Sequence, residues 1–187
     1  MKQMLLPKNC YGYYRPAITP LGIVAHYMSA QYANNIGLDN SDPYDVNVCY
    51  EILKHYGYSA HVLIGRDGEQ YQLVPFMCQA YHAGLSIMNG REDCNKFTLS
   101  FECISIGKPN INGDPAFEES QIESIIDLIQ SWVNTYSIEK DWIKGHSDVR
   151  DAALAAGLTY SDGSTPSKKY DPGQHFPWQR ILNTVRF

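Results

Sequence analysis

Two histidines and one aspartate stand where the chain could bind a metal ion. His26 and His146 each close a short apolar segment, and Asp171 directly precedes a proline. Sites in open sheets usually lie beyond the ends of strands, and two imidazoles with one carboxylate suit a zinc ion that keeps a fourth position open. Each residue also has an ordinary structural interpretation, as a strand-end histidine or part of an Asp-Pro turn. The spacing of the three residues does not by itself link them.

Glu102 is a candidate for moving protons. It lies between Phe101 and Cys103 in an apolar stretch, where a carboxylate is costly unless it is paired or hydrogen-bonded. A partly desolvated carboxylate beside a metal commonly transfers protons at neutral pH. The alternative is that Glu102 faces solvent on an edge strand, and the sequence alone favours neither interpretation.

Lys169 stands two residues before Asp171. Because Pro172 favours extended backbone at Asp171, the two side chains should point the same way and enter one pocket. The alternative is that Lys168 and Lys169 form a solvated basic pair.

His175 and Asp148 compete with Asp171 for the position of third ligand. His175 follows Asp171 by four residues, a spacing that suits one face of a helix, but the proline and glycine at 172–173 disfavour a continuous helix there. Asp148 would share a face with the second histidine only if the chain were extended. The residues alone therefore leave the third ligand open among Asp171, His175 and Asp148.

Hydrophobic spacing predicts the elements that must position these residues. We expect strands at residues 21–26, 60–65, 69–75, 97–106 and 142–146, the second and third joined as a hairpin by Asp67-Gly68. We expect helices at residues 48–56, 117–136 and 178–185. Residues 152–156 could form one helical turn, whereas the rest of 149–168 is typical of an exposed loop that could form one rim of a cleft. This order of elements favours one mixed α/β domain.

Composition narrows the class of protein. Hydrophobic residues make up 44% and charged residues 19% of the chain, and 15 basic against 20 acidic side chains give a net charge of −5. This balance argues against nucleic acid as a partner and describes an ordinary globular protein. Without an apolar run long enough for a secretory signal or a membrane span, we expect synthesis in the cytoplasm. The five scattered cysteines predict reduced thiols.

Six short stretches of the chain follow one another along about residues 20–180. They are Gly22-Ile23-Val24-Ala25-His26, residues 59–68, Tyr81-His82-Ala83-Gly84, Gly90-Arg91-Glu92-Asp93-Cys94-Asn95, Gly145-His146-Ser147-Asp148 and Lys169-Tyr170-Asp171-Pro172-Gly173. In this order they resemble the zinc-dependent type 2 N-acetylmuramoyl-L-alanine amidases. That family includes a cytosolic recycling amidase for anhydromuramyl-peptides, small phage lysozyme-amidases and peptidoglycan recognition proteins.

The resemblance implies a mixed central β-sheet flanked by helices, in one amidase domain spanning residues 1–187. It implies hydrolysis of the amide between N-acetylmuramic acid and L-alanine, in peptidoglycan or in anhydromuropeptide fragments, with one zinc ion per chain. The positions that match the family's site residues are His26, His146 and Asp171 as zinc ligands, and Glu102 and Lys169 as catalytic groups. We also expect His82, Arg91 and Asn95 to contact the substrate.

Three departures from the family pattern accompany the resemblance. Ser100 replaces a glycine before the glutamate, and Tyr81 replaces the usual tryptophan before His-Ala-Gly. Residues 149–168 look inserted, so the assignment of Asp171 rests on its Lys-x-Asp-Pro-Gly motif.

Two alternative functions stay open. One is a non-catalytic peptidoglycan-binding module, which would lack a metal ligand, and the other is a zinc peptidase that cuts within the stem peptide. The absence of a secretory signal is compatible with both a recycling enzyme and a phage lysin released through a membrane pore.

Overall fold

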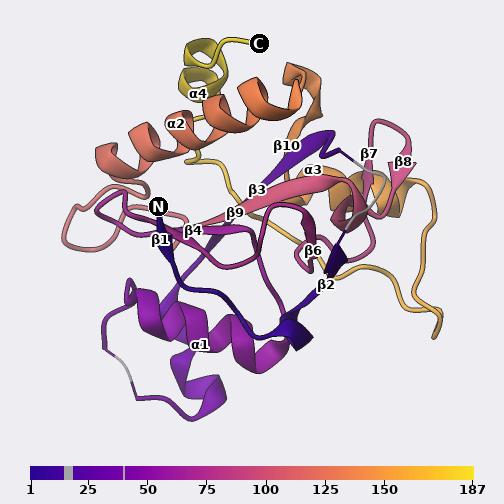
Figure 1. Ribbon diagram of the computed structural model, residues 1–187. Coiled ribbons are helices and arrows are strands. Elements are labelled where there is room, and N and C mark those ends of the chain that lie inside the picture. Colours follow the sequence, from indigo (N-terminus) through magenta and orange to yellow (C-terminus); the bar gives the residue numbers. More distant parts are fainter. Residues whose placement is uncertain (15–18, 40) are drawn as a thin grey trace.

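The computed structural model describes residues 1–14, 19–39 and 41–187 (Figure 1). Within these residues, six strands form a central sheet in the order β1–β5–β4–β9–β3–β10. In that order the strands are Lys2–Gln3, Gln70–Gln72, Val62–Ile64, Thr98–Ile104, Gly22–Met28 and Ile143–Gly145. Neighbouring strands are parallel except for β4 and β5, which form the expected hairpin. The sheet is therefore mixed, which confirms the fold class that the resemblance implied.

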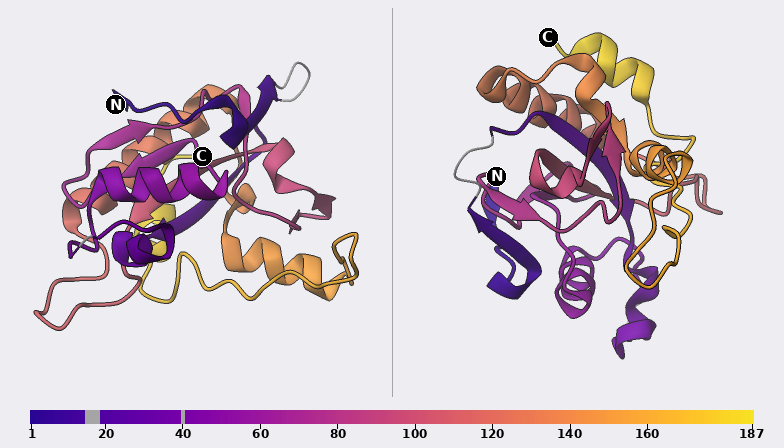
Figure 2. Two further views of the ribbon diagram at one scale, coloured as in Figure 1. Left: turned by 90° about the horizontal axis from the view of Figure 1, so that it is seen from below. Right: turned by 90° about the vertical axis from the view of Figure 1, so that its right-hand side faces the viewer.

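Helices cover both faces of the sheet (Figures 1 and 2). α2 (Glu119–Tyr136) and α4 (Trp178–Thr184) lie together on one side. α1 (Val46–Tyr56) lies on the other side, and α3 (His146–Ala155) packs against β3 through Val149 and Val24. The predicted helices are confirmed, with boundaries shifted by at most two residues. None of the described helices has the length and apolar content needed to span a bilayer.

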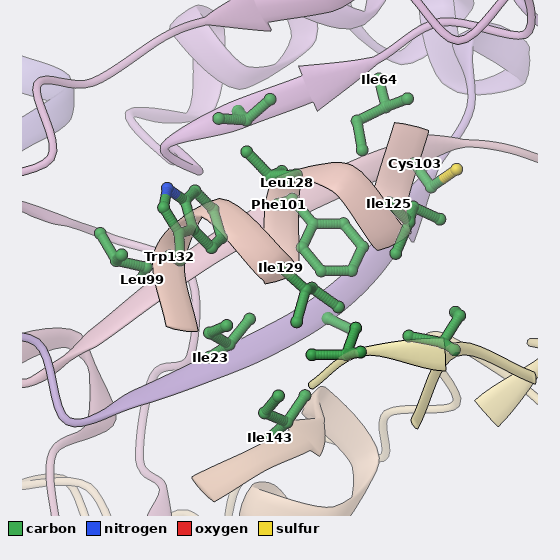
Figure 3. Packing of buried hydrophobic residues seen from close by; sticks show 14 of the residues in the cluster. Ile23, Ile64, Leu99, Phe101, Cys103, Ile125, Leu128, Ile129, Trp132 and Ile143 are labelled. Atoms are coloured by element: carbon green, nitrogen blue, oxygen red, sulfur yellow. The ribbon is translucent and has the colours of Figure 1, made fainter. Parts of the chain in front are cut away.

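The main core lies between α2 and the middle of the sheet. Ile125, Ile129 and Trp132 of α2 are buried against Leu99 and Phe101 of β9 (Figure 3). Side chains alternate between the two faces of a strand, so the even-numbered residues of β9, including Glu102, lie on the opposite face. The apolar contacts with α2 thus fix which face carries the polar residues.

The ends of α1 follow from side-chain chemistry. The carboxylate of Asp45 accepts hydrogen bonds from the backbone N–H groups of Asn47 and Val48, which caps the first turn. Gly57 ends the helix in the left-handed region at φ 68°, where a residue without Cβ is favoured. The helix thus ends at Tyr56, where the predicted range 48–56 also ends.

All five predicted strands have different ends in the structure, and two of these differences concern the histidines. His26 does not end β3, because Tyr27 and Met28 continue the parallel pairing with β9. His146 does not end β10: the strand ends at Gly145, and His146 is the first residue of α3. Both histidines nevertheless lie at the same end of neighbouring strands.

The expected loop at residues 149–168 is only partly a loop. Residues 149–155 belong to α3, because Val149 and Ala153 recur at helical spacing and are buried, and the alanine-rich sequence has high helix propensity. Residues 156–168 are irregular and mostly exposed, as expected, with Pro166 buried.

Smaller elements complete the described chain. β2 (Tyr11–Tyr14) pairs with β6 (Cys78–Ala80), and β7 (Ile87–Met88) pairs with β8 (Arg91–Glu92). Short 3₁₀ helices occupy Lys8–Cys10, Ala30–Ile36, Cys94–Lys96 and Lys140–Trp142. The five cysteines are free thiols, which agrees with the prediction of reduced cysteines.

Candidate metal centre and catalytic cavity

His26, His146 and Asp171 meet in one cluster. Nδ1 of His26 lies 3.1 Å from Nδ1 of His146, and Oδ2 of Asp171 lies 2.9 Å from the first nitrogen and 3.0 Å from the second. His26 is 1% exposed and His146 is 7% exposed. Within the described part of the chain, these three form the group of His, Cys, Asp or Glu side chains whose ligand atoms are close enough to hold a metal ion.

The register of the sheet brings the two histidines and Glu102 together. His26 of β3 is the direct partner of Glu102 on β9, so the two side chains share one face. On the other side of β3, Gly145 pairs with Ala25, and His146 therefore follows next to His26.

Asp171 reaches the cluster because its backbone crosses the start of α3. The backbone N–H of Ser147 donates a 3.0 Å hydrogen bond to the carbonyl of Asp171. A Cβ on Gly145 would lie 2.6 Å from Cδ of Pro172, so the crossing needs a glycine at that position. Asp148, one of the rival ligands, instead accepts a hydrogen bond from the backbone N–H of Gly145.

The cluster fits a small divalent cation. Tetrahedral zinc with bonds of about 2.0–2.1 Å places its ligand atoms about 3.3 Å apart, close to the 2.9–3.1 Å observed. Burial lowers the pKa of His26 to about 4, so its imidazole stays neutral and keeps a lone pair. Burial opposes ionisation of Asp171, but its contacts with His146 and His26 outweigh this effect and lower the pKa of that carboxyl.

A chain of hydrogen bonds behind His26 selects its tautomer. The hydroxyl of Thr98 donates to the carbonyl of Cys94 at 2.7 Å, so its oxygen accepts from Nε2 of His82 at 3.2 Å. Nδ1 of His82 is then an acceptor and receives the Nε2 proton of His26 at 3.0 Å. This leaves Nδ1 of His26 unprotonated and facing the cluster. Such outer partners commonly fix the orientation of metal-ligating histidines.

Glu102 is a half-buried acid beside this cluster. Its strand β9 lies between β4 and β3, so the edge-strand alternative is wrong. Its Oε2 is buried without a hydrogen-bond partner among the described residues. Burial raises the pKa of Glu102 well above its usual value, the charge of Asp171 raises it further, and the charge of Lys169 acts in the opposite direction. A cation at the cluster would act in the same direction as Lys169 and favour the carboxylate.

A cavity of about 440 Å³ opens over these residues. Its walls include the three cluster residues, Glu102, Lys169, His82 and Asn95 from the predicted set. Residues that sequence reasoning did not single out also line it, among them Tyr58, Arg150 and Tyr160. The position of Arg150, four residues after His146, would have placed it on the cluster side had α3 been predicted.

The remaining predicted residues have distinct positions. Asn95 accepts hydrogen bonds through Oδ1 from the backbone N–H groups of His82 and Ala83. Arg91 is exposed on β8, and its guanidinium lies 5.0 Å from the ring centroid of Phe97. It is not among the described residues that line the cavity. His175, the other rival ligand, is exposed and contacts Gln174 rather than the cluster.

Comparison with known proteins agrees with this geometry. The family described as N-acetylmuramoyl-L-alanine amidase matches residues 16–174 of the chain. The chain is similar to the 1,6-anhydro-N-acetylmuramyl-L-alanine amidase AmpD of Enterobacter cloacae, with 33% identity over 140 residues, which cover 75% of this chain and 63% of that protein. The protein of the same name from Haemophilus influenzae is 35% identical over 129 residues, which cover 68% of this chain and 59% of that protein. The chain thus aligns with less than two thirds of the length of these relatives.

A solved structure has the same fold. The crystal structure of a selenomethionine derivative of AmpD superposes with a TM-score of 0.69 and 26% sequence identity. The alignment covers 99% of this chain and 94% of that chain.

Proposed function

The chain belongs to the N-acetylmuramoyl-L-alanine amidase family, and we propose that it hydrolyses the amide joining the lactyl group of N-acetylmuramic acid to L-alanine. The observation that carries this proposal is the convergence of His26, His146 and Asp171 at a cavity, with the carboxyl of Glu102 on the neighbouring strand. We treat residues 1–187 as one amidase domain.

In this proposal the cluster holds one zinc ion per chain. When bound, zinc supplies Lewis acidity, which polarises a carbonyl group and acidifies water at neutral pH. His26 and His146 contribute Nδ1 and Asp171 contributes Oδ2, the atoms that converge in the cluster. The hydrogen bond from His26 to His82 keeps the first of these nitrogens available.

Glu102 acts as general base and then as general acid. Its Oε2 accepts a proton from the water whose oxygen adds to the lactyl carbonyl, and returns that proton to the L-alanine nitrogen as the C–N bond breaks. The products are the muramyl carboxylate and a peptide with a free amino terminus. The absence of a hydrogen-bond partner for Oε2 among the described residues supports this role.

Lys169 stabilises the negative charge that develops on the carbonyl oxygen during this addition. Its place in the cavity wall and the effect of its charge on Glu102 support the assignment. Removing one such donor commonly lowers turnover about 10²–10³-fold.

We propose soluble anhydromuropeptides, rather than intact peptidoglycan, as the natural substrate. The two curated relatives are named for 1,6-anhydro-N-acetylmuramyl-L-alanine. The net charge of −5 also gives no general attraction to anionic wall polymers. A cytoplasmic place of action is part of this proposal.

The test is hydrolysis of 1,6-anhydro-N-acetylmuramyl-L-alanyl-D-glutamate by the zinc-loaded protein, followed by mass spectrometry. We expect free 1,6-anhydro-N-acetylmuramic acid and L-alanyl-D-glutamate. Products cut between alanine and glutamate would identify a stem-peptide peptidase, and tight binding without turnover would identify a binding module. Faster turnover of whole sacculi than of the soluble compound would overturn the substrate preference alone.

A further inference from the structure

Residues 158–168 form a wall of the cavity that has few attachments to the rest of the chain. Tyr160 lines the cavity from this segment, and its hydroxyl lies 3.0 Å from the position that a Cβ on Gly84 would take. Within the segment, the backbone of Tyr160 makes hydrogen bonds with Ser164 and Gly163, which closes a tight turn. These bonds shape the turn but do not fix it to the domain.

Arg150 of α3 attaches the end of this segment. Its Nε donates a 3.0 Å hydrogen bond to the carbonyl of Ser167, and its Nη2 donates a 2.9 Å hydrogen bond to the carbonyl of Pro166. Among the described residues, these two bonds are the ones that tie residues 159–168 to other parts of the chain. The Arg150 side chain is only 11% exposed, and a planar guanidinium can hold two acceptors at fixed angles.

A second attachment to α3 comes a few residues after Ser167, at Asp171. The N–H of Ser147, one turn before Arg150 on α3, donates to the carbonyl of Asp171. Lys169 lies between the two attached points, two residues after Ser167 and two before Asp171. One helix thus holds both ends of the short segment that carries Lys169 into the cavity.

We propose that Arg150 is a positioning residue, which fixes the backbone of Pro166 and Ser167 so that Lys169 enters the cavity in a defined place. This inference rests on the proposed function insofar as Lys169 acts on the substrate. It assigns a role to residues 156–168, because the contact of their last part with α3 determines from which point the backbone enters Lys169. Asp171 keeps its own attachment to Ser147, so its position does not depend on Arg150.

The experiment compares Arg150→Ala and Arg150→Lys with Asp151→Ala as the matched control. The Asp151 carboxylate is exposed and pairs with Nη1 of Arg150, so its removal leaves both carbonyl bonds in place. Lysine keeps the charge of Arg150 but offers one ammonium group, which cannot reproduce a planar fork on two carbonyls.

Three measurements are made on each variant. Hydrogen exchange of peptides covering residues 158–170 is followed in the protein without substrate. Zinc affinity is measured by competition with a chelator, and kcat and KM are measured on a soluble muramyl-dipeptide. We expect faster exchange and an about 10- to 100-fold lower kcat in Arg150→Ala, because small misplacements of a catalytic group have effects of that size. Zinc affinity should stay within about threefold in all variants, and Arg150→Lys should remain impaired while Asp151→Ala behaves like the unchanged protein.

Two results would overturn the proposal. One is unchanged exchange of residues 158–170 in Arg150→Ala; the other is a loss of zinc affinity as large as the loss of kcat, because it would mean that Asp171 had moved as well. If the unchanged protein does not hydrolyse the muramyl-dipeptide, the exchange and zinc measurements still decide whether Arg150 holds the segment. That failure would then count against the proposed function alone.

Discussion

Replacing His82 by alanine tests whether the hydrogen-bond chain behind His26 prepares the metal centre. The substitution removes the acceptor that lies 3.0 Å from Nε2 of His26. The ring of His26 is then free to rotate or to change tautomer, and either change turns its lone pair away from the cluster. Loss of an outer partner of this kind commonly lowers metal affinity 10–100-fold, which corresponds to about 1.4–2.7 kcal/mol.

The effect on folding should be smaller than the effect on zinc binding. A buried donor left without a partner destabilises a protein by about 1–3 kcal/mol. His82 is half-buried and lines the cavity, so water can enter the space it leaves and form a hydrogen bond with His26 in either tautomer. We therefore expect the free energy of unfolding to fall by about 1 kcal/mol. This lowers the melting temperature of a chain of this size by about 2–4 °C.

The assay is competition for zinc between the protein and a fluorescent chelator, with melting temperature measured in parallel. His175→Ala is the matched control, because it removes a histidine that is exposed and lies outside the cluster. Thr98→Val should show a weaker form of the defect, since it removes the hydroxyl that accepts from His82. Unchanged zinc affinity in His82→Ala would refute the tautomer argument, whatever happens to activity.

Three further predictions follow from the same site. Glu102→Gln should keep zinc but lower kcat by about 10²–10⁴-fold, because glutamine cannot accept a proton; steady-state kinetics with metal analysis checks this, and activity within a few-fold of the unchanged protein would make Glu102 structural. Gly145→Ala places a Cβ 2.6 Å from Cδ of Pro172, so it should destabilise the fold by about 1–3 kcal/mol and weaken zinc binding, measured by denaturant unfolding and chelator competition. Metal analysis should find one zinc per chain, with activity lost on chelation and restored by zinc, and Asp171→Ala should not retain the metal; full activity in metal-free protein would contradict this.

Local periodicity was sufficient to predict the central part of the fold. A strand at residues 97–106 places Leu99 and Phe101 on one face and Glu102 on the other, and the burial of the first two against α2 agrees with this. The same pattern left open whether Glu102 faces solvent, because the sequence of one strand does not show which strands pair with it. That question depended on the parallel pairing of β9 with both β4 and β3.

The start of α3 shows a different limit of sequence reasoning. Residues 142–146 have the composition of a short strand, and the prediction extended the strand to His146. In the structure, Asp148 accepts a hydrogen bond from the backbone N–H of Gly145 and helps to begin a helix at His146. A single capping contact of this kind decides a boundary that hydrophobic spacing cannot locate.

The position of Asp171 could be assigned from its motif but not explained from the sequence. Its carboxylate joins the cluster because its backbone crosses the end of β10, where Ser147 donates to its carbonyl and Gly145 leaves room for the adjacent proline. This crossing fixes the distance between Asp171 and His146 regardless of how many residues separate them along the chain. The metal centre can therefore tolerate a long insertion before Asp171, provided that the chain contacts α3 again at Asp171. Lys169 has no such bond of its own among those that the structure describes, so the accuracy of its placement depends on how the preceding residues are held. An insertion at this point should consequently lower turnover more than it lowers metal affinity.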